Sequence, residues 1–520
     1  MKYELFRAQK STDDAHARGL RISGPHGALW RKSLHQCQRK GNLSDEHSPI
    51  SGIDRPVYIL TILLVVVLVG FAVSGLDDLV IDIVYWNRRL GDRHDRGRYL
   101  KRSQLDAIAE QPAAILTATW HEYDVIGEML RFNAKRIDYE NYDFVIGTYP
   151  NDPRTQQAVD LVASEFPHIA KGVNSRDGPT NKADCLNVAV EALRRREAER
   201  GERYAFIVLH DPEDVMHPLE LKLYNRIFAS RGDIDMIQTP IYPFVAKIWE
   251  FTAGAYMDEF AEQHTKNLYA REWAGTFIPS AGVATAIRRD ALDRIAEGDK
   301  PFGIQSLTED YEIGLKLAME GMLAVFVRQV LGSTQPDGTV RHDVIATRAN
   351  FPHTFRTAIR QRTRWTLGIV FQAREHWGWV GGWRMRWMLF HDRKGPWSYT
   401  LVTSGYLLVL YVAAYAIVRQ FLYPEWDGPI PGGSVMGWGL VAGLTMMTHR
   451  MVQQVISTTR VYGWRQGLLS IPRHPWATLI NLVATVRALR QFRRAQRENA
   501  TLSWDHTQHF IPDHVAKTEG

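Results

Sequence analysis

The sequence predicts an α/β domain with a mostly parallel sheet, attached to a membrane by apolar helices on both sides. Short apolar runs alternate with helical stretches between residues 105 and 345, which is the βαβα order of a parallel sheet covered on both faces. Long apolar stretches precede and follow this region, at 57–76 and 398–418. With 520 residues, the chain is long enough for more than one domain and a large core.

The N-terminal segment, residues 1–56, is polar and has no apolar periodicity, so we expect it to be disordered. The run at 57–76 carries no charge and has the length of about 20 residues that a membrane span needs. Its uninterrupted length argues against a buried core helix, and we predict a transmembrane helix with its extension over 57–86. A basic patch follows at Arg88, Arg89, Arg93, Arg96, Arg98, Lys101 and Arg102. Because basic residues near a span favour the cytoplasm, we place the following domain there and the N-terminus outside.

The central region, residues 87–350, is the predicted α/β domain. Its expected strands lie at 113–119, 142–149, 204–210 and 234–240, and its expected helices at 124–136, 155–166, 182–199 and 309–320.

The C-terminal region becomes membrane-like again. We expect interfacial helices over 351–397 and two transmembrane helices over 398–456, of which the second, at 434–449, is the weaker. An interfacial helix at 476–489 and a cytoplasmic tail are expected within 457–520.

The overall charge restricts the classes of partner. The net charge of +6 and the pI near 9.1 suit nucleic acid, a nucleotide-linked substrate or an anionic membrane face. The sequence has no recognised nucleic-acid motif, so we expect no nucleic-acid partner. The two cysteines, Cys37 and Cys185, are too few for a disulfide framework or a zinc site.

Three acids follow the predicted strand at 204–210, in the stretch "DPEDVMHP": Asp211, Glu213 and Asp214. Ligands of open α/β sheets bind beyond the carboxyl ends of the strands, and carboxylates there suit a hard divalent cation. The alternative is an acidic turn that caps the next helix.

Two further motifs lie at predicted helix starts. Thr308, Glu309 and Asp310 precede an apolar helical pattern, where they are either catalytic or an N-cap with acids that complement the helix dipole. Lys182 and Asp184 begin another helix, where the lysine either contacts a phosphate or is solvated.

The stretch "QRTRW" combines Gln361, Arg364 and Trp365. An arginine can hold a phosphate through two parallel hydrogen bonds, and a tryptophan offers a flat face to a sugar ring. The alternative is the basic side of an interfacial amphipathic helix.

The order of these motifs resembles that of family 2 glycosyltransferases, in particular the membrane-integrated members similar to cellulose and hyaluronan synthases. The resemblance covers residues 57–510 and is closest to the bacteriophage adsorption protein B group of inner-membrane glycosyltransferases. It is carried by "TATWHEYDVIGEML", "GTYPNDPRT", "LHDPEDVMHPLEL", "PSAGVATAIRRDAL", "LTEDYEIGLKL", "RQRTRWTLGIVFQ" and "WDHTQHFIP".

The resemblance implies a GT-A (Rossmann-like) fold, a nucleotide-sugar donor that is usually a UDP-sugar, inversion at the anomeric carbon, and Mg or Mn. Asp211 and Glu213 match the metal-binding "DxD" position, followed here by Asp214. Asp310 matches the general base of "TED", which Thr308 and Glu309 complete.

The same resemblance assigns the substrate contacts. Gln361 and Arg364 would hold the diphosphate, and Trp365 would border the acceptor sugar. The family's lysine and aspartate of "KAxxLN" correspond to Lys182 and Asp184. The nucleoside contacts would be Glu122, after the first strand, and Asp152, which is the one acid in place of the usual pair after the second strand. The polar insertion at 331–350 is expected to be a gating or acceptor loop.

We therefore expect a multi-pass protein of the bacterial inner membrane that transfers sugar from a nucleotide-sugar to a growing exported polysaccharide. Expected partners are the donor, a sugar-polymer or lipid-linked acceptor, membrane lipids, and an outer-membrane or periplasmic export partner. The alternatives are transfer of one sugar to a lipid phosphate carrier, and a non-catalytic membrane receptor or scaffold.

Overall fold

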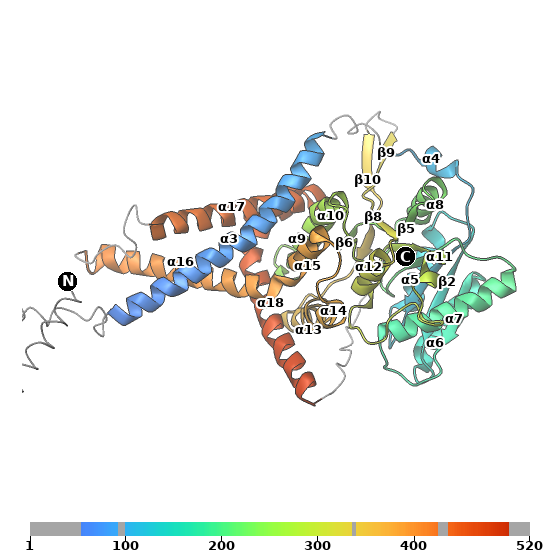
Figure 1. Cartoon of the computed structure of the whole chain (residues 1–520). Coiled ribbons are helices and arrows are strands. Elements are labelled where there is room, and N and C mark those ends of the chain that lie inside the picture. Colours follow the sequence, from blue (N-terminus) through green and yellow to red (C-terminus); the bar gives the residue numbers. More distant parts are fainter. Residues whose placement is uncertain (1–53, 92–98, 335–339, 425–434, 499–520) are drawn as a thin grey trace, which may run out of the picture. The chain divides into compact units, whose positions relative to one another are not determined.

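The computed structural model describes residues 54–91, 99–334, 340–424 and 435–498 (Figure 1). Nearly all of the segment expected to be disordered, 1–56, therefore lies outside the described residues. The chain divides into two units, 1–66 and 67–520. The described part of the first unit is the beginning of helix α3 (Asp54–Gly91), and the rest of the fold belongs to the second.

A seven-stranded sheet with the order β3-β2-β1-β4-β7-β5-β8 forms the centre of the domain. Six of its strands are parallel to one another, and β7 runs antiparallel to both neighbours. The strands are β1 (Ala113–Ala118), β2 (Tyr142–Thr148), β3 (Ile169–Val173), β4 (Phe206–Leu209), β5 (Ile234–Gln238), β7 (Thr285–Arg288) and β8 (Leu323–Phe326). This sheet confirms the predicted α/β class with a mostly parallel sheet.

Helices cover both faces of the sheet, because β1, β2 and β4 are almost entirely buried apolar runs that need cover on either side. The helices of this domain are α4 (Arg102–Asp106), α5 (Ile126–Arg136), α6 (Pro153–Glu165), α7 (Lys182–Arg200), α8 (Glu220–Ser230), α11 (Arg289–Arg294) and α12 (Glu309–Met319). One core cluster unites α7, α11 and α12 with alternate strand residues, such as Leu116. The opposite cluster unites α5, α6 and α8 with residues such as Ile115. The four strands and four helices expected from the sequence all form, with end points shifted by at most two residues.

Further strands form two small sheets beside the main one. The antiparallel pair β9 (Val330–Thr334) and β10 (Val340–Val344) occupies much of the expected polar insertion. The pair β6 (Ile241–Pro243) and β11 (Thr347–Ala349) is parallel.

The remaining described helices of this unit lie between β6 and β7 or follow β11 in the chain. They are α9 (Phe251–Glu262), η2 (Gln263–Asn267), α10 (Leu268–Trp273), α13 (Phe355–Trp365), η3 (Thr366–Gln372), α14 (Ala373–Trp377), α15 (Trp383–Arg393), α16 (Gly395–Phe421), α17 (Val435–Tyr462) and α18 (Trp464–Glu498). The helix expected at 476–489 is thus part of the much longer α18.

Two described helices are long and apolar enough to cross a membrane, at Ile62–Leu90 in α3 and Gly395–Phe421 in α16. The expected weaker span at 434–449 lies in α17, which does not reach this standard of length and apolarity. The acids that end the apolar part of α3 are held by polar partners: Asp77 accepts a hydrogen bond from Trp387, and Asp78 pairs with Lys394 at 2.6 Å. These buried contacts attach α3 to the helices around the domain.

Candidate active site

The site lies where the strand order of the sheet reverses. From β1 the chain proceeds outward through β2 and β3, whereas β4 lies on the other side of β1. The loops after β1 and β4 therefore diverge and leave a crevice beyond the carboxyl ends of the strands, which is the usual ligand position in such sheets. The loop after β1 contains Glu122, and the turn after β4 contains Asp211.

Two adjoining cavities occupy this crevice, and Lys182, Asp211 and Arg364 line both. The larger has a volume of about 90 Å³ and the smaller of about 50 Å³. Predicted site residues lining the larger are Lys182, Asp211, Glu213, Asp214, Thr308, Glu309, Asp310, Gln361, Arg364 and Trp365. The smaller is lined by Glu122 together with Trp120 and Tyr149. The fold therefore brings together all the predicted site residues except Asp152 and Asp184.

The turn that carries the acids is fixed from within. Asp214 Oδ2 accepts a hydrogen bond of 2.8 Å from the backbone N–H of Asp211 and lies 3.1 Å from His210 Nδ1. The other ring nitrogen of His210 lies 3.0 Å from Glu220 Oε1. Burial alone would lower the pKa of His210, but the two carboxylates raise it to about 9, so the imidazolium donates to both. Asp214 thus holds the turn through Oδ2, and all three acids line the larger cavity.

A lysine–aspartate pair links the start of α7 to the turn after β4. Lys182, the first residue of α7, forms a half-buried ion pair with Asp211. Burial alone would lower the pKa of Lys182, but the carboxylates of Asp211, Glu309 and Asp310 raise it above its usual value. The ammonium group is therefore charged and stands among the acids of the cavity.

The first turn of α12 places two carboxyl groups on the other side of the cavity. Burial raises the pKa of Asp310, and burial together with the charge of Asp310 raises the pKa of Glu309 to about 7. Asp310 Oδ1 accepts a hydrogen bond of 2.7 Å from the N–H of Tyr311. Gly282, with φ of +73°, packs directly on Asp310, because a Cβ added there would lie 2.6 Å from Asp310 Oδ2. The small residues of "PSAGV" therefore allow close approach to the predicted base.

Helix α13 contributes the polar groups opposite the acids. Gln361 Oε1 and Arg364 Nε are buried and have no hydrogen-bond partner among the described residues. Buried polar atoms are nearly always satisfied, so these two point to a ligand that is bound during function. The Trp365 ring packs on Tyr256 and Phe260, with centroid distances of 6.1 and 6.3 Å, which fixes its position at the cavity wall.

A π-helical segment, η3, follows α13 in the chain, and its side chains contact the loop before α12. Gln372 accepts a hydrogen bond of 3.0 Å from Leu307 N and donates one of 3.3 Å to Gln305 O. Gly368 of the same segment packs against the Thr308 side chain. Irregular helical turns often occur at functional sites, and this one ties the "QxxRW" helix to the "TED" loop.

The two predicted residues outside the cavities hold loops instead. Asp152 caps α6 by accepting from Thr155 N at 3.3 Å, and it also accepts from His121 N at 2.6 Å, which fixes the loop after β1. The Asp184 carboxylate accepts from Asn174, Arg176 and Thr180 at 2.8 to 2.9 Å. Both carboxylates therefore hold loops and do not line the two cavities.

Two aromatic residues in the smaller cavity were not foreseen. Trp120 and Tyr149 meet edge to face, with ring centroids 5.1 Å apart, and follow the first two strands. Their signal in the sequence is an aromatic residue directly after an apolar strand, in "TATW" and "VIGTY".

The cavity offers the type of ligand atom that a hard cation prefers. Asp211 and Glu213 supply two carboxylates at the cavity, and Mg²⁺ commonly takes one or two carboxylates together with substrate phosphates. Among the described residues, the metal-type group with ligand atoms within 4.8 Å of one another is Asp77, Asp78 and His391. In that group His391 pairs with Asp77, and Lys394 pairs with both aspartates. The ligand atoms of Asp211, Glu213 and Asp214 do not converge so closely.

The crevice thus combines strand-end acids with a lysine, an arginine and a glutamine. Residues 206–421 match the family described as "Glycosyl transferase family group 2". This part of the chain is therefore similar to that family of glycosyltransferases, and the mostly parallel sheet confirms the expected α/β class.

Two relatives extend the match along the chain. Bacteriophage adsorption protein B of Escherichia coli strain K12 and bacteriophage N4 adsorption protein B of Escherichia coli O157:H7 are each 38% identical over 478 residues, which is 89% of this chain. The chain spans 64% of the length of these relatives. The predicted resemblance to the adsorption protein B group is confirmed.

Solved structures show more distant similarity. The mannosyltransferase PcManGT from Pyrobaculum calidifontis, in complex with GDP-Man and Mn²⁺, is 15% identical with a TM-score of 0.46, and the match covers 82% of this chain and 98% of that one. Residues 1–349 of TarS from S. aureus are 10% identical with a TM-score of 0.31, covering 77% and 98%.

Proposed function

We propose that this protein is an inverting glycosyltransferase of the bacterial inner membrane, which transfers sugar from a nucleotide-sugar, preferably a UDP-sugar, to a growing exported polysaccharide. The observation that carries the proposal is the crevice itself. It combines strand-end acids, a buried carboxyl pair and the cations Lys182 and Arg364 in one place. These are the groups that sugar transfer from a diphosphate needs.

Each group has a defined task in the proposed reaction. The Asp310 carboxylate accepts the proton of the acceptor hydroxyl as that oxygen attacks the anomeric carbon from the face opposite the leaving group. The bond between the anomeric carbon and the phosphate oxygen breaks, and the diphosphate leaves with the bonding electrons. Arg364 and Lys182 stabilise the negative charge on that diphosphate. Gln361 donates or accepts a further hydrogen bond beside it.

Mg or Mn is the proposed cofactor. Asp211 and Glu213 would hold it, and when bound it would supply positive charge for the leaving diphosphate. Asp214 would orient the turn through its contacts with His210 and Asp211.

The smaller cavity is the proposed nucleoside site. Trp120 and Tyr149 offer aromatic surface to a base, and Glu122 offers a carboxylate to its polar edge. The two cavities together are much smaller than the several hundred Å³ of usual ligand pockets. We therefore expect Arg364 and the neighbouring side chains of α13 to move outward when the donor enters.

The proposed membrane arrangement has α3 and α16 as spans, with α17 as a third and the α/β domain in the cytoplasm. Polar contacts of Asp77 and Asp78 mark the end of the apolar part of α3. In this arrangement α13 and α18 form the interfacial layer, so the acceptor end of the site faces the bilayer. Membrane lipids and an export partner on the far side complete the proposal.

The test is a panel of nucleotide-sugars with purified full-length protein, in which release of nucleoside diphosphate is measured with Mn²⁺, with Mg²⁺ and with EDTA. The proposal expects turnover with one donor class and its loss in EDTA and in Asp310→Asn. A folded wild-type protein that turns over no donor contradicts it.

Radiolabelled donor added to membranes then identifies the acceptor. A long labelled polymer supports elongation of a polysaccharide. A chloroform-soluble product with one sugar would instead establish transfer to a lipid phosphate carrier. The names of the relatives refer to phage adsorption, which favours a receptor role as a second candidate. Phage adsorption that persists in cells carrying only Asp310→Asn would support this non-catalytic role.

A further inference from the structure

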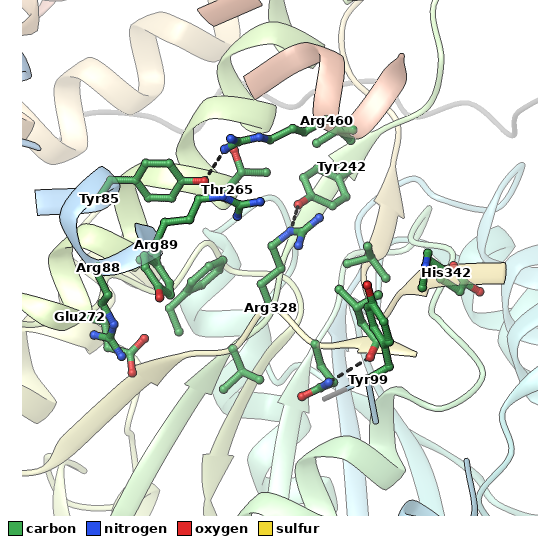
Figure 2. Close-up of a pocket in the computed structure, with 18 of the residues that line it drawn as sticks. Tyr85, Arg88, Arg89, Tyr99, Tyr242, Thr265, Glu272, Arg328, His342 and Arg460 are labelled. Carbon is green, nitrogen blue, oxygen red and sulfur yellow. Dashed lines mark hydrogen bonds between the residues drawn. The ribbon is translucent and has the colours of Figure 1, made fainter. Parts of the chain in front are cut away.

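A further cavity, here called the arginine pocket, lies apart from the carboxylates of the candidate active site (Figure 2). Its volume is about 970 Å³, and it shares no lining residue with the two cavities described above. Its cationic lining residues are Arg88, Arg89, Arg328, Arg348 and Arg460, against the two acids Glu272 and Asp343. The pocket therefore carries an excess of positive charge.

The arginines come from different parts of the fold and point to a common region. Arg89 lies in the last turn of α3, Arg328 follows β8, and Arg460 lies in the last turn of α17 (Figure 2). Arg460 donates to the hydroxyl of Tyr85, and Arg328 donates to the hydroxyl of Tyr242 at 3.4 Å. These hydroxyl partners are neutral, so they orient the guanidinium groups without compensating their charge.

The arginines of this pocket are close enough for their charges to repel one another. Burial lowers the pKa of Arg460, and although Tyr85 opposes this, the nearby charges of Arg89 and Arg328 lower it further. In addition, Arg348 Nη1 is buried and has no hydrogen-bond partner among the described residues. A bound anion would relieve the repulsion and satisfy this group.

Arg88 is an exception within the same pocket. Figure 2 shows its side chain directed toward Glu272, away from the other guanidinium groups. The charge of Arg88 also lowers the pKa of Glu272, which burial raises. This arginine is therefore already compensated and serves as an internal control.

An aromatic pair forms the other side of the pocket. Tyr99 and His342 lie with ring centroids 4.2 Å apart and planes inclined by 35°. Figure 2 shows both across the cavity from Arg89 and Arg460. Exposed aromatic faces stack readily on planar rings, including nucleobases.

The pocket shares a wall with the candidate active site. In the pair β6–β11, Ile241 and Ala349 line the active-site cavity, whereas Tyr242 and Arg348, which are paired with each other, line the arginine pocket. Alternate residues of a strand point to opposite faces, so one thin ladder separates the two cavities.

We propose that the arginine pocket is a second, non-catalytic binding site for a soluble phosphate-bearing anion with a planar ring, of the nucleotide class. The phosphates bind between Arg89, Arg328, Arg348 and Arg460, and the ring lies against Tyr99 and His342. The β6–β11 ladder then connects occupancy of this site with the wall of the active site.

The position along α3 favours a soluble anion over a lipid headgroup. Asp78 pairs with Lys394 at the end of the apolar part of α3, and Arg88 lies ten residues further along the same helix. At a rise of 1.5 Å per residue, this corresponds to about 15 Å beyond the apolar part of the helix.

The experiment measures binding of inorganic pyrophosphate and of guanosine diphosphate to the full chain in detergent by calorimetry, at low salt and in EDTA. EDTA removes the cation that would support diphosphate binding at Asp211 and Glu213. The variants are Arg328→Gln/Arg460→Gln, the matched control Arg88→Gln, and Arg364→Gln for the candidate active site.

We expect the double variant to weaken pyrophosphate binding by about 10²-fold or more, since the loss of each charged hydrogen bond weakens binding by about tenfold or more. Arg88→Gln and Arg364→Gln should change it by less than about threefold. Guanosine diphosphate should bind more tightly than pyrophosphate, and Tyr99→Ala should remove that difference. If the double variant does not elute as a single folded species, the single variants Arg328→Gln and Arg460→Gln replace it.

Two results would overturn the proposal. The first concerns the position of the site: pyrophosphate binds equally to the wild type and the double variant, or Arg364→Gln alone abolishes the binding. The second comes from nanodiscs: if phosphatidylglycerol, but not phosphatidylcholine, blocks pyrophosphate and is retained only by the wild type, the occupant is a lipid headgroup.

Discussion

Two polar regions of the described chain, the candidate active site and the arginine pocket, differ in how their charges are compensated. In the first, Lys182 stands among carboxylates and forms an ion pair with Asp211. In the second, Arg328 and Arg460 have tyrosine hydroxyls as partners. Binding of an anion requires only the second arrangement, whereas group transfer also requires a base and ligands for a cation. Mixed charge therefore distinguishes the proposed chemical site from the proposed binding site.

The two regions also differ in volume. The arginine pocket has about 970 Å³, compared with about 90 Å³ at the carboxylates. Volume alone would place the substrate in the arginine pocket. The convergence of Asp211, Asp310 and Arg364 instead favours the 90 Å³ cavity as the proposed chemical site, where the pKa values of Lys182 and Asp310 are both raised.

The largest effect is expected from Asp310→Asn. An amide cannot accept the proton of the acceptor hydroxyl, so sugar transfer should fall by about 10²–10⁴-fold. Pyrophosphate binding in the arginine pocket should be unchanged, which separates the two regions. The matched control is Glu312→Gln on the same helix, where the carboxylate contacts His376 and Trp377. Equal loss in both variants would contradict a specific role for Asp310.

The second prediction contrasts two neighbouring acids. Asp211→Asn should lower transfer by about 10²-fold and raise the Mn²⁺ concentration needed, because it removes a proposed metal ligand. Asp214→Asn should instead lower thermal stability, since breaking a buried ion pair costs about 3–5 kcal/mol. Activity titrated against Mn²⁺ and thermal unfolding of both variants provide the test. The assignment fails if Asp214→Asn alone shifts the metal requirement.

The third prediction concerns the pH profile. The charge of Arg364 lowers the pKa of Asp310, which burial raises. Arg364→Gln removes this effect, so the pKa of Asp310 rises further and a higher pH is needed to ionise the base. The acid limb of the transfer profile should move upward by about one unit, with a rate loss of about 10²-fold. Arg360→Gln, on the same helix, should leave the limb in place.

The smallest effect is expected from Gly282→Ala. The added methyl group would meet Asp310 Oδ2, and the backbone at φ of +73° disfavours any residue with a Cβ. Transfer should fall by about tenfold, and stability should fall by about 1 kcal/mol. Gly232→Ala, where nothing lies within 4 Å of the added group, is the control. A fully active Gly282→Ala enzyme would show that Asp310 tolerates displacement.

Much of the fold followed from local patterns. The runs that became β1, β2, β4 and β5 are apolar and of strand length, and burial on both faces requires such runs. The short strand β7, "TAIR", gave no such signal, because it ends in charge and depends on both neighbours for pairing. Its antiparallel direction is a property of the assembled sheet.

The candidate site was predictable to a similar extent. Motif order identified the residues that line the crevice, but it also included Asp152 and Asp184, whose carboxylates are occupied by backbone and side-chain donors. Trp120 and His210 lie within the motifs of the resemblance but received no role, because the function of an aromatic ring or an imidazole at a strand end depends on its neighbours in the fold.

The sequence by itself determined the α/β class, the apolar helices on either side and the identity of the polar groups in the crevice, because strand burial, span length and residue chemistry are local properties. Only the tertiary structure decided that Lys182 pairs with Asp211 and that α13 covers the acids of α12. It also gathered Arg89, Arg328, Arg348 and Arg460 from distant parts of the chain into one pocket. Such groupings depend on strand order and helix packing, which bring together residues that no spacing along the chain connects.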